Sequence, residues 1–170
     1  MAQLTVSAPI PQPNPDEVLV EALARVHVDG WREAYGHLLS AKFYGEEALA
    51  SRQAMWRSLL AHESVGERVR IARDAGSTVV GFAITGSSRD ADLGCRELYA
   101  LYIRAAHYGS GAGQALLDAV LGTQPASLWV AADNPRARRF YEKNGFRTDG
   151  AAKDDPEAEG LTEVRMVRPA

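Results

Sequence analysis

Hydrophobic residues along this chain follow two spacings, one typical of helices and one typical of strands. The range 45–62 predicts a helix, because its apolar residues recur three and four positions apart. The ranges 4–6, 68–75, 78–85 and 93–103 predict strands, and a hairpin turn is predicted at Ala75-Gly76-Ser77. Such a mixture of helices and strands indicates an α/β protein.

A helix start is predicted after a proline-rich connector. Asn14 supplies a capping side chain, Pro15 suits the first helical position and Glu17 suits the third. This helix is expected to run to about Val28 and to be broken by Gly30. A second, shorter helix is then predicted over 31–39.

The most informative segment lies between Leu101 and Leu117. A strand-like run enters a loop with glycines at 109, 111 and 113, and a helix-like run from Gln114 to Leu121 leaves it. Glycine lets the backbone approach a ligand and adopt positive φ, and the first turn of a helix offers unpaired N–H groups. This combination suits a phosphate or diphosphate ligand.

Two common phosphate-binding motifs do not fit this loop. A nucleoside-triphosphate P-loop needs Gly-Lys-Ser/Thr, but Gly113 is followed by Gln114 and Ala115. The dinucleotide pattern G-x-G-x-x-G also fails, because its third glycine position falls on Gln114 or Leu116. Taken alone, the loop fits a ligand site and a plain glycine-rich turn equally well.

A second segment changes this balance. The range 127–132 predicts a buried strand, and a short helix is predicted over 136–144. Asn134 suits the N-cap, Pro135 the first helical position and Gly145 the helix stop. Both ends of this helix are therefore marked in the sequence.

Together the two segments resemble the signature motifs of the GNAT superfamily, the acyl-CoA-dependent N-acyltransferases. The family's loop pattern, Gln/Arg-x-x-Gly-x-Gly/Ala, maps to 108–113, with Tyr108 in place of the usual Gln or Arg. The second pattern, Asn-x-x-Ala-x-x-Phe-Tyr-Glu-Lys-x-Gly-Phe, maps to 134–146. Both patterns occur in the family's order, and each helix follows a predicted strand.

The resemblance implies a GNAT fold over a single domain of residues 1–170: a central mixed, mostly antiparallel, twisted sheet with a splayed pair of strands, flanked by helices. Strands over 146–150 and 161–167 would close the sheet, with an acidic loop over 151–160 between them. The family also implies acetyl-CoA as co-substrate and no metal. The implied coenzyme-binding residues are Leu101, Tyr102, Ile103, Tyr108, Gly109, Ser110, Gly111, Ala112, Gly113, Gln114, Asn134, Ala137 and Tyr141.

Composition narrows the class of protein further. The 170 residues carry a formal net charge of -3, which gives no sign of a nucleic-acid-binding surface. The lone Cys95 excludes an internal disulfide and a cysteine-based zinc cluster, and the four histidines lack metal-ligand spacing. No signal peptide or membrane-spanning run is recognised, so we expect a cytoplasmic protein without a membrane partner.

Acetyl transfer to an amine needs a proton acceptor, because an alkyl amine with a pKa of about 10.4 is mostly protonated at neutral pH. Strand alternation predicts one face containing Glu97, Tyr99, Leu101 and Ile103. The position of Glu97 before the loop resembles that of the base glutamate in histone-acetylating members of the family. Glu97 is therefore a candidate catalytic base.

Glu97 also has a purely structural interpretation. A carboxylate at a strand end can be solvated and paired with Arg96 or Arg104. Many members of the family use a distant carboxylate through water, or none. Glu163, near the last strand, is a weaker substitute for the base.

The remaining chemical roles come from the resemblance. Amides near Leu101 and Tyr102 should hold the thioester carbonyl, and Ile103 should pair with the pantetheine arm. Tyr141 is the expected general acid, since a phenol with a pKa of about 10 stays protonated at neutral pH. The alternative for Tyr141 is a core aromatic beside Phe140.

The acceptor site is expected under the first helices, where Trp31 and Tyr35 offer aromatic faces that attract cationic amines. Core packing explains Trp31 equally well. We therefore expect an N-acetyltransferase that acts on a primary amine of a small molecule. The amine should attack acetyl-CoA directly in a ternary complex, without a covalent intermediate on Cys95. The alternatives are acetylation of a protein N-terminus or lysine, and a non-catalytic acyl-CoA-binding regulatory module. The resemblance also allows a homodimer.

Overall fold

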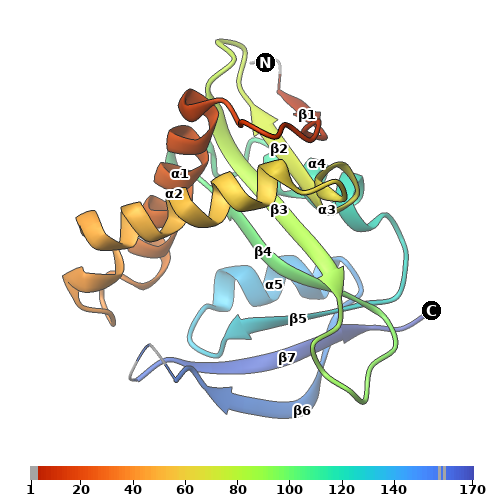
Figure 1. Ribbon diagram of the computed structural model, residues 1–170. Helices are drawn as coiled ribbons and strands as arrows, with labels where there is room; N and C mark the ends of the chain where they lie inside the picture. The colour runs from red at the N-terminus through yellow and green to blue at the C-terminus, as the bar shows by residue number, and fades with distance from the viewer. Residues whose placement is uncertain (1–3, 157, 159) are drawn as a thin grey trace.

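The computed structural model describes residues 4–156, 158 and 160–170, which contain a seven-stranded sheet with helices on both faces (Figure 1). The strands are β1 (Thr5–Ser7), β2 (Val69–Arg73), β3 (Val79–Ser87), β4 (Arg96–Ile103), β5 (Ala126–Ala131), β6 (Arg147–Asp154) and β7 (Thr162–Arg168). Their order is β1-β2-β3-β4-β5-β7-β6. All neighbours are antiparallel except β4 and β5, which are parallel. The predicted mixed, mostly antiparallel sheet is confirmed.

Helices cover the sheet unevenly. They are α1 (Glu17–Tyr35), α2 (Glu46–Ala61), α3 (Val65–Arg68), α4 (Ala112–Leu121) and α5 (Pro135–Lys143), with short 3-10 turns η1 (Ala41–Phe43) and η2 (Ala105–His107). Helices α1 and α2 lie over one face of β2, β3 and β4, and α4 and α5 lie on the opposite face (Figure 1). None of the helices in the described part of the chain has the length and apolar character needed to span a bilayer.

Each face of the sheet has its own hydrophobic core. Under α1 and α2, the fully buried Trp56 packs edge-on against Phe82 of β3, with ring centroids 4.7 Å apart. Under α4 and α5, Leu116 packs with Phe146 and Met166 in a second buried cluster. Burial of apolar area on both faces is the main stabilising contribution to this layered arrangement.

Helix α1 differs from its prediction at both ends. The N-cap is Asp16 rather than Asn14, and its Oδ1 accepts the Val18 N–H at 3.0 Å. The helix then continues through Gly30 to Tyr35, so the predicted break and the separate short helix are wrong. Gly30 is buried at a contact with the sheet, where a small residue is required by packing rather than by a change of direction.

Several strand boundaries also move. Strand β4 begins at Arg96 instead of Leu93, and β6 extends to Asp154, into the range predicted as an acidic loop. Glu157 and Glu159 of that loop lie outside the described residues. The turn between β2 and β3 forms as predicted, because Asp74 Oδ1 accepts the N–H groups of residues 76 and 78 at 2.9 Å.

Candidate active site

Strands β4 and β5 separate after a short stretch of pairing. Their Cα partners run from Arg96 and Ala126 to Leu98 and Leu128. On its other side, β4 continues to pair with β3 as far as Ile103. The predicted splayed pair is therefore present, and the β5 side of β4 is open beyond Leu98.

The hydrogen bonds between β4 and β3 decide which amides of β4 face this opening. The Arg104 N–H donates to the Val80 carbonyl at 2.9 Å. In an antiparallel ladder, successive residues direct their backbone groups to opposite sides. The Tyr102 amide therefore points toward β3, and the amides of Leu101 and Ile103 point toward the opening. Of the three predicted backbone positions, Leu101 and Ile103 thus offer N–H donors to the opening, and Tyr102 does not.

A β-bulge at Tyr99 changes which side chains share a face of β4. The register with β3 shifts at this point, and Tyr99 is the extra residue. Leu101 and Ile103 belong to the core on the α4 side, whereas Tyr99 packs on the α1 and α2 side. The predicted single face for Glu97, Tyr99, Leu101 and Ile103 is wrong, because an inserted residue reverses the alternation beyond it.

The glycine loop leads from η2 into α4. Gly109 and Gly111 have φ values of 76° and 88°, which favour glycine, and a Cβ on either would meet open space. Gly111 is the N-cap of α4, which therefore has no capping side chain. By contrast, Asp16 caps α1 and Asn134 caps α5. The start of α4 is thus left available to an external hydrogen-bond acceptor.

Individual groups of this loop support that interpretation. The Ala112 N–H reaches Ser110 Oγ at 3.3 Å. Within the described ranges, the N–H groups of Gly113 and Gln114 have no acceptor. The side chain of Gln114 is bound elsewhere, because its Nε2 donates to Asn144 Oδ1 at 2.7 Å. Only the backbone of Gln114 therefore fits its predicted role at the coenzyme.

Helix α5 begins beside the same opening. Asn134 Oδ1 accepts the Ala137 N–H at 3.1 Å, which confirms the predicted cap. Tyr141 lies further along the same helix and is 7% exposed. Its ring centroid is 5.2 Å from that of Phe140 and 5.8 Å from that of Phe146. Tyr141 therefore packs in the hydrophobic core beside Phe140, as its alternative interpretation expects.

The protonation state of Tyr141 suits a proton donor. Burial raises the pKa of its phenol well above the ordinary value, and the nearby Tyr35 adds to the increase. The hydroxyl is consequently protonated at neutral pH. Among the residues described, no hydrogen-bond partner holds this hydroxyl, so it remains able to donate to a ligand.

Tyr35 connects α1 with the start of α5. Burial raises the pKa of Tyr35, a hydrogen bond with the Asn134 side chain opposes this change, and the charge of Glu163 reinforces it. Trp31 packs edge-on against Tyr35, with centroids 5.5 Å apart, and stacks on Phe43 at 6.0 Å. The two predicted acceptor residues are thus together, and Tyr35 lies within reach of both Asn134 and Glu163.

A small hydrophobic cluster lies beside Trp31 and Tyr35. Its buried members are Leu39, Ala131, Ala158 and Leu161. The aromatic side chains packed against it are Trp31, Tyr35, Phe43 and Tyr44. The segment after α1 therefore meets the connection between β6 and β7 next to the end of β5.

Glu97 is fully buried, and its carboxylate is bound by Arg89. The Arg89 backbone N–H donates to Oε2 at 2.8 Å, its Nε donates to Oε1 at 3.0 Å, and its Nη2 also contacts Oε1. Glu97 is therefore neither solvated nor paired with Arg96 or Arg104. Sequence reasoning missed Arg89, because nothing in the loop between β3 and β4 distinguishes it from other surface arginines.

The loop that carries Arg89 is fixed to the sheet. Arg165 on β7 binds Asp92 at 2.9 Å and Asp149 at 2.8 Å. Trp129 on β5 donates from Nε1 to Asp90 Oδ2 at 2.9 Å. These contacts attach the residues that follow Arg89 to β5 and β7.

Glu163 is the second carboxylate near the opening. It lies on β7 opposite Ala131, the last residue of β5, and its side chain is 23% exposed. Burial raises the pKa of Glu163, while the charge of Lys153 lowers it. The Lys153 Nζ is 3.6 Å from Glu163 Oε2. Glu163 is thus held by a longer contact than those that bind Glu97.

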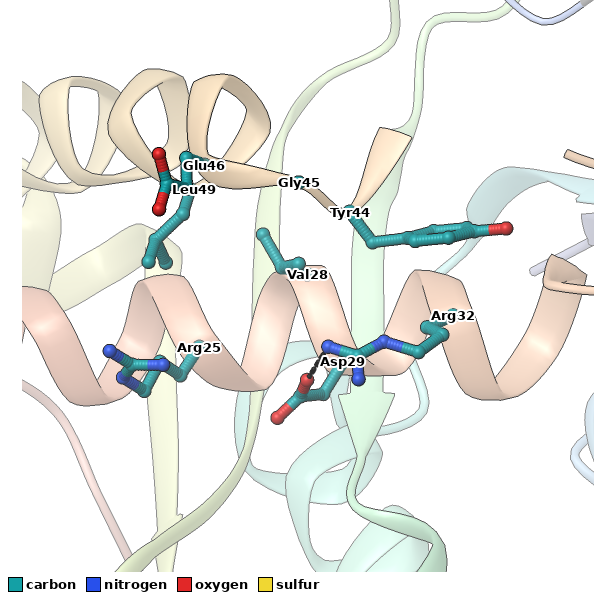
Figure 2. Close-up of a pocket in the computed structure, with 8 residues that line it drawn as sticks. All are labelled: Arg25, Val28, Asp29, Arg32, Tyr44, Gly45, Glu46 and Leu49. Carbon is teal, nitrogen blue, oxygen red and sulfur yellow. Dashed lines mark hydrogen bonds and ion pairs between the residues drawn. The ribbon is translucent and has the colours of Figure 1, made fainter. Parts of the chain in front are cut away.

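Other parts of the chain offer weaker candidate sites. A cavity of about 250 Å³ lies between α1 and the start of α2 (Figure 2). Its arginines are neutralised locally, because Arg32 binds Asp29 at 2.7 Å and Arg25 pairs with Glu21. The cavity contains no residue of the opening or the glycine loop. In the described ranges, no group of His, Cys, Asp and Glu side chains is arranged to hold a metal.

The sequence and fold are similar to those of known acetyltransferases. Residues 65–148 match the family described as Acetyltransferase (GNAT) domain. The chain is 30% identical over 149 residues to the uncharacterized N-acetyltransferase YuaI of Bacillus subtilis (strain 168), covering 84% of this chain and 82% of that protein.

Two solved structures share the fold over nearly the whole chain. PH1933 from Pyrococcus horikoshii OT3 has a TM-score of 0.72 at 20% identity, with 99% of each chain covered. PaiA N-acetyltransferase from Thermoplasma acidophilum, in complex with coenzyme A, has a TM-score of 0.68 at 18% identity and the same coverage.

Proposed function

This chain belongs to the GNAT superfamily of N-acetyltransferases, and we propose that it transfers the acetyl group of acetyl-CoA to a primary amine of a small molecule. One observation carries the proposal: the opening between β4 and β5 leads directly into the uncapped glycine start of α4. Free strand amides suit the amide-containing arm of an acyl-CoA, and a free helix start suits its phosphates.

The residues present fit this coenzyme. Gly109 and Gly111 leave space at the loop, and the N–H groups of Gly113 and Gln114 can bind phosphate oxygens. The N–H groups at 101 and 103 can bind the pantetheine arm and the thioester carbonyl. The fold shared with PaiA, whose structure contains coenzyme A, supports this placement. When bound, acetyl-CoA supplies the activated acetyl group.

Tyr141 is the proposed proton donor to the departing thiolate. Its phenol is protonated at neutral pH because burial raises its pKa. A buried donor close to the opening also keeps water away from the reacting groups. A positioned acid of this kind contributes about 10²- to 10⁴-fold to a reaction rate.

Glu163 is the proposed acceptor of the amine proton. The carboxylate of Glu97 is occupied by its hydrogen bonds with Arg89, whereas the ion pair of Glu163 among the described residues is the longer contact with Lys153. The raised pKa of Glu163 also brings it closer to neutral pH, where a general base works best. Glu97 then anchors the loop between β3 and β4 instead of acting on the substrate.

The acceptor is proposed to be small. The cluster around Leu39 and Leu161 joins the segment after α1 to the connection between β6 and β7. An extended peptide needs an uninterrupted groove, whereas this contact crosses the end of the opening. The aromatic faces of Trp31 and Tyr35 beside it favour a cationic amine.

Direct transfer is supported by the position of the cysteine. Cys95 lies immediately before β4, at the end where β4 and β5 are still paired. A covalent acetyl-cysteine would require the thiol at the open end, beside the amides of residues 101 and 103. The proposed reaction therefore takes place with both substrates bound.

Thiol release from acetyl-CoA tests this function. The protein is incubated with small primary amines, with peptides that carry free N-termini or lysines, and with water, while coenzyme binding is followed by calorimetry. Release that depends on small amines supports the proposal. Release with peptides alone would move the acceptor class to proteins, and binding without release would favour a non-catalytic module.

A further inference from the structure

The proposed base and the site of acetyl transfer lie on different strands. The N–H groups that suit the thioester carbonyl belong to residues 101 and 103 of β4, whereas Glu163 is on β7, beyond β5. Neighbouring strands lie about 4.8 Å apart, so β4 and β7 would be about 10 Å apart even if β4 and β5 stayed paired. Because β4 and β5 separate, the gap is wider still. A group that spans this gap would give the amine proton a path to Glu163.

Tyr35, at the end of α1, lies on the side of the sheet where such a group is needed. Its ring packs against the hydrophobic cluster that contains Ala131, the last residue of β5. Ala131 is the cross-strand partner of Glu163, and cross-strand partners place their side chains on the same face of a sheet. The charge of Glu163 also raises the pKa of Tyr35, and Tyr35 in turn adds to the raised pKa of Tyr141. Tyr35 is therefore close to both residues that are proposed to move protons.

The hydrogen bond with Asn134 orients the Tyr35 hydroxyl. Asn134 Oδ1 accepts the Ala137 N–H at 3.1 Å, which leaves the Asn134 Nδ2 group to donate to the Tyr35 oxygen. A donor at this oxygen lowers the pKa of a phenol, which agrees with the effect of Asn134 on Tyr35. A hydroxyl has one hydrogen and two lone pairs. The hydrogen of Tyr35 and its second lone pair are thus directed away from Asn134.

We propose that the Tyr35 hydroxyl passes the amine proton to Glu163. The inference rests on the proposed function, because it assumes that Glu163 is the base of an acetyl transfer. As the amine nitrogen bonds to the thioester carbon, its proton moves to the Tyr35 oxygen and the Tyr35 hydrogen moves to a carboxylate oxygen of Glu163. The C–S bond breaks, and the sulfur takes its proton from Tyr141. The two transfers through Tyr35 occur together, since the raised pKa of Tyr35 disfavours a free phenolate.

A double-mutant cycle tests whether Tyr35 acts through Glu163. Tyr35→Phe keeps the ring and is expected to lower kcat with a small primary amine by about 100-fold, the lower end of the range for a positioned proton-transfer group. Its KM for the amine should change little. In a Glu163→Gln background the final acceptor is already missing, so Tyr35→Phe should cause little further loss. In a Tyr141→Phe background, where the other proton is affected, it should keep its full effect.

Tyr44→Phe is the matched control for Tyr35→Phe. Tyr44 packs against the same cluster, but its hydroxyl donates to the Leu39 carbonyl and its side chain lines the cavity between α1 and α2. This variant should keep the kcat of the wild type. Thermal unfolding and the dissociation constant of acetyl-CoA show that each variant is folded and binds the coenzyme.

The outcomes separate this inference from the proposed function. If the wild type is active and Tyr35→Phe keeps its full kcat, the inference is wrong. If Tyr35→Phe costs as much with Glu163→Gln as without it, Tyr35 acts independently of Glu163, and the inference is also wrong. A fully active Glu163→Gln would overturn the inference and leave the acetyl transfer itself standing. A wild type that acetylates no small amine would overturn both.

Discussion

Gly30 of α1 lies directly against Tyr102 of β4. A Cβ on Gly30 would stand 2.8 Å from Tyr102 Cδ1, which is closer than real Cβ atoms approach. The missing side chain therefore sets how closely α1 approaches the sheet. Trp31 and Tyr35 follow on the same helix, so this contact also fixes their height above the opening between β4 and β5.

Gly30→Ala should destabilise the fold by about 1–3 kcal/mol, the usual cost of overpacking. The effect should appear although alanine favours a helix by about 1 kcal/mol over glycine. Urea unfolding measures it, with Gly94→Ala as control because a Cβ on Gly94 meets open space. Equal stability of the two variants would contradict the close contact.

His27 should make stability depend on pH. Burial, together with the charge of Arg52, lowers its pKa to about 3. The unfolded chain, with a histidine pKa of about 6.5, then binds more protons between these values. Stability is complete above about pH 6.5 and is lost as the pH falls, by about 2 kcal/mol from pH 7 to pH 5.

Urea unfolding at pH 7 and pH 5 checks this expectation. His27→Gln removes the titrating group, so its stability should fall less between the two pH values than that of the wild type. The comparison uses the change with pH within each protein and is independent of any constant loss from the substitution. Equal losses in both proteins would show that His27 is not the group responsible.

Tyr141→Phe should lower kcat by about 100-fold or more, because the thiolate then leaves without a positioned acid. The dissociation constant of acetyl-CoA should stay within about twofold, since the ring and its packing are retained. Steady-state kinetics and calorimetry provide the two readouts. Tyr99→Phe is the control, because the Tyr99 hydroxyl donates to the Ser87 carbonyl at 2.6 Å on the other side of the sheet, and it should leave kcat unchanged. An unchanged kcat in Tyr141→Phe would exclude the acid role.

The two carboxylates should respond differently to amide substitution. Glu163→Gln should lower kcat by about 100-fold and remove the rise of activity with pH that follows deprotonation of Glu163. Glu97→Gln should instead lower the thermal midpoint, because it weakens the buried pairing with Arg89. The pH–rate profile distinguishes the two. A stable Glu97→Gln protein without activity, beside an active Glu163→Gln, would reverse the assignment.

Local signals in the sequence were sufficient for much of this picture. The glycine loop and the Asn134 cap each depend on residues a few positions apart, so they are visible in a single chain. The mixed sheet and its splayed pair followed from the family resemblance and are present in the structure.

Features that depend on distant contacts were not predictable in this way. Gly30 indicated a helix break because its requirement comes from Tyr102, far along the chain. The bulge at Tyr99 has no local signal in the sequence. Strand alternation therefore wrongly placed Glu97 on the same face of β4 as Leu101 and Ile103.

Transfer of a labelled acetyl group tests the central claim most directly. The protein is supplied with acetyl-CoA labelled with ¹³C in the acetyl group and with a panel of small primary amines, and products are analysed by mass spectrometry. The account predicts labelled N-acetyl amine in a one-to-one ratio with free CoA. Free CoA formed without labelled amine, or bound acetyl-CoA that stays intact with every amine, would contradict it.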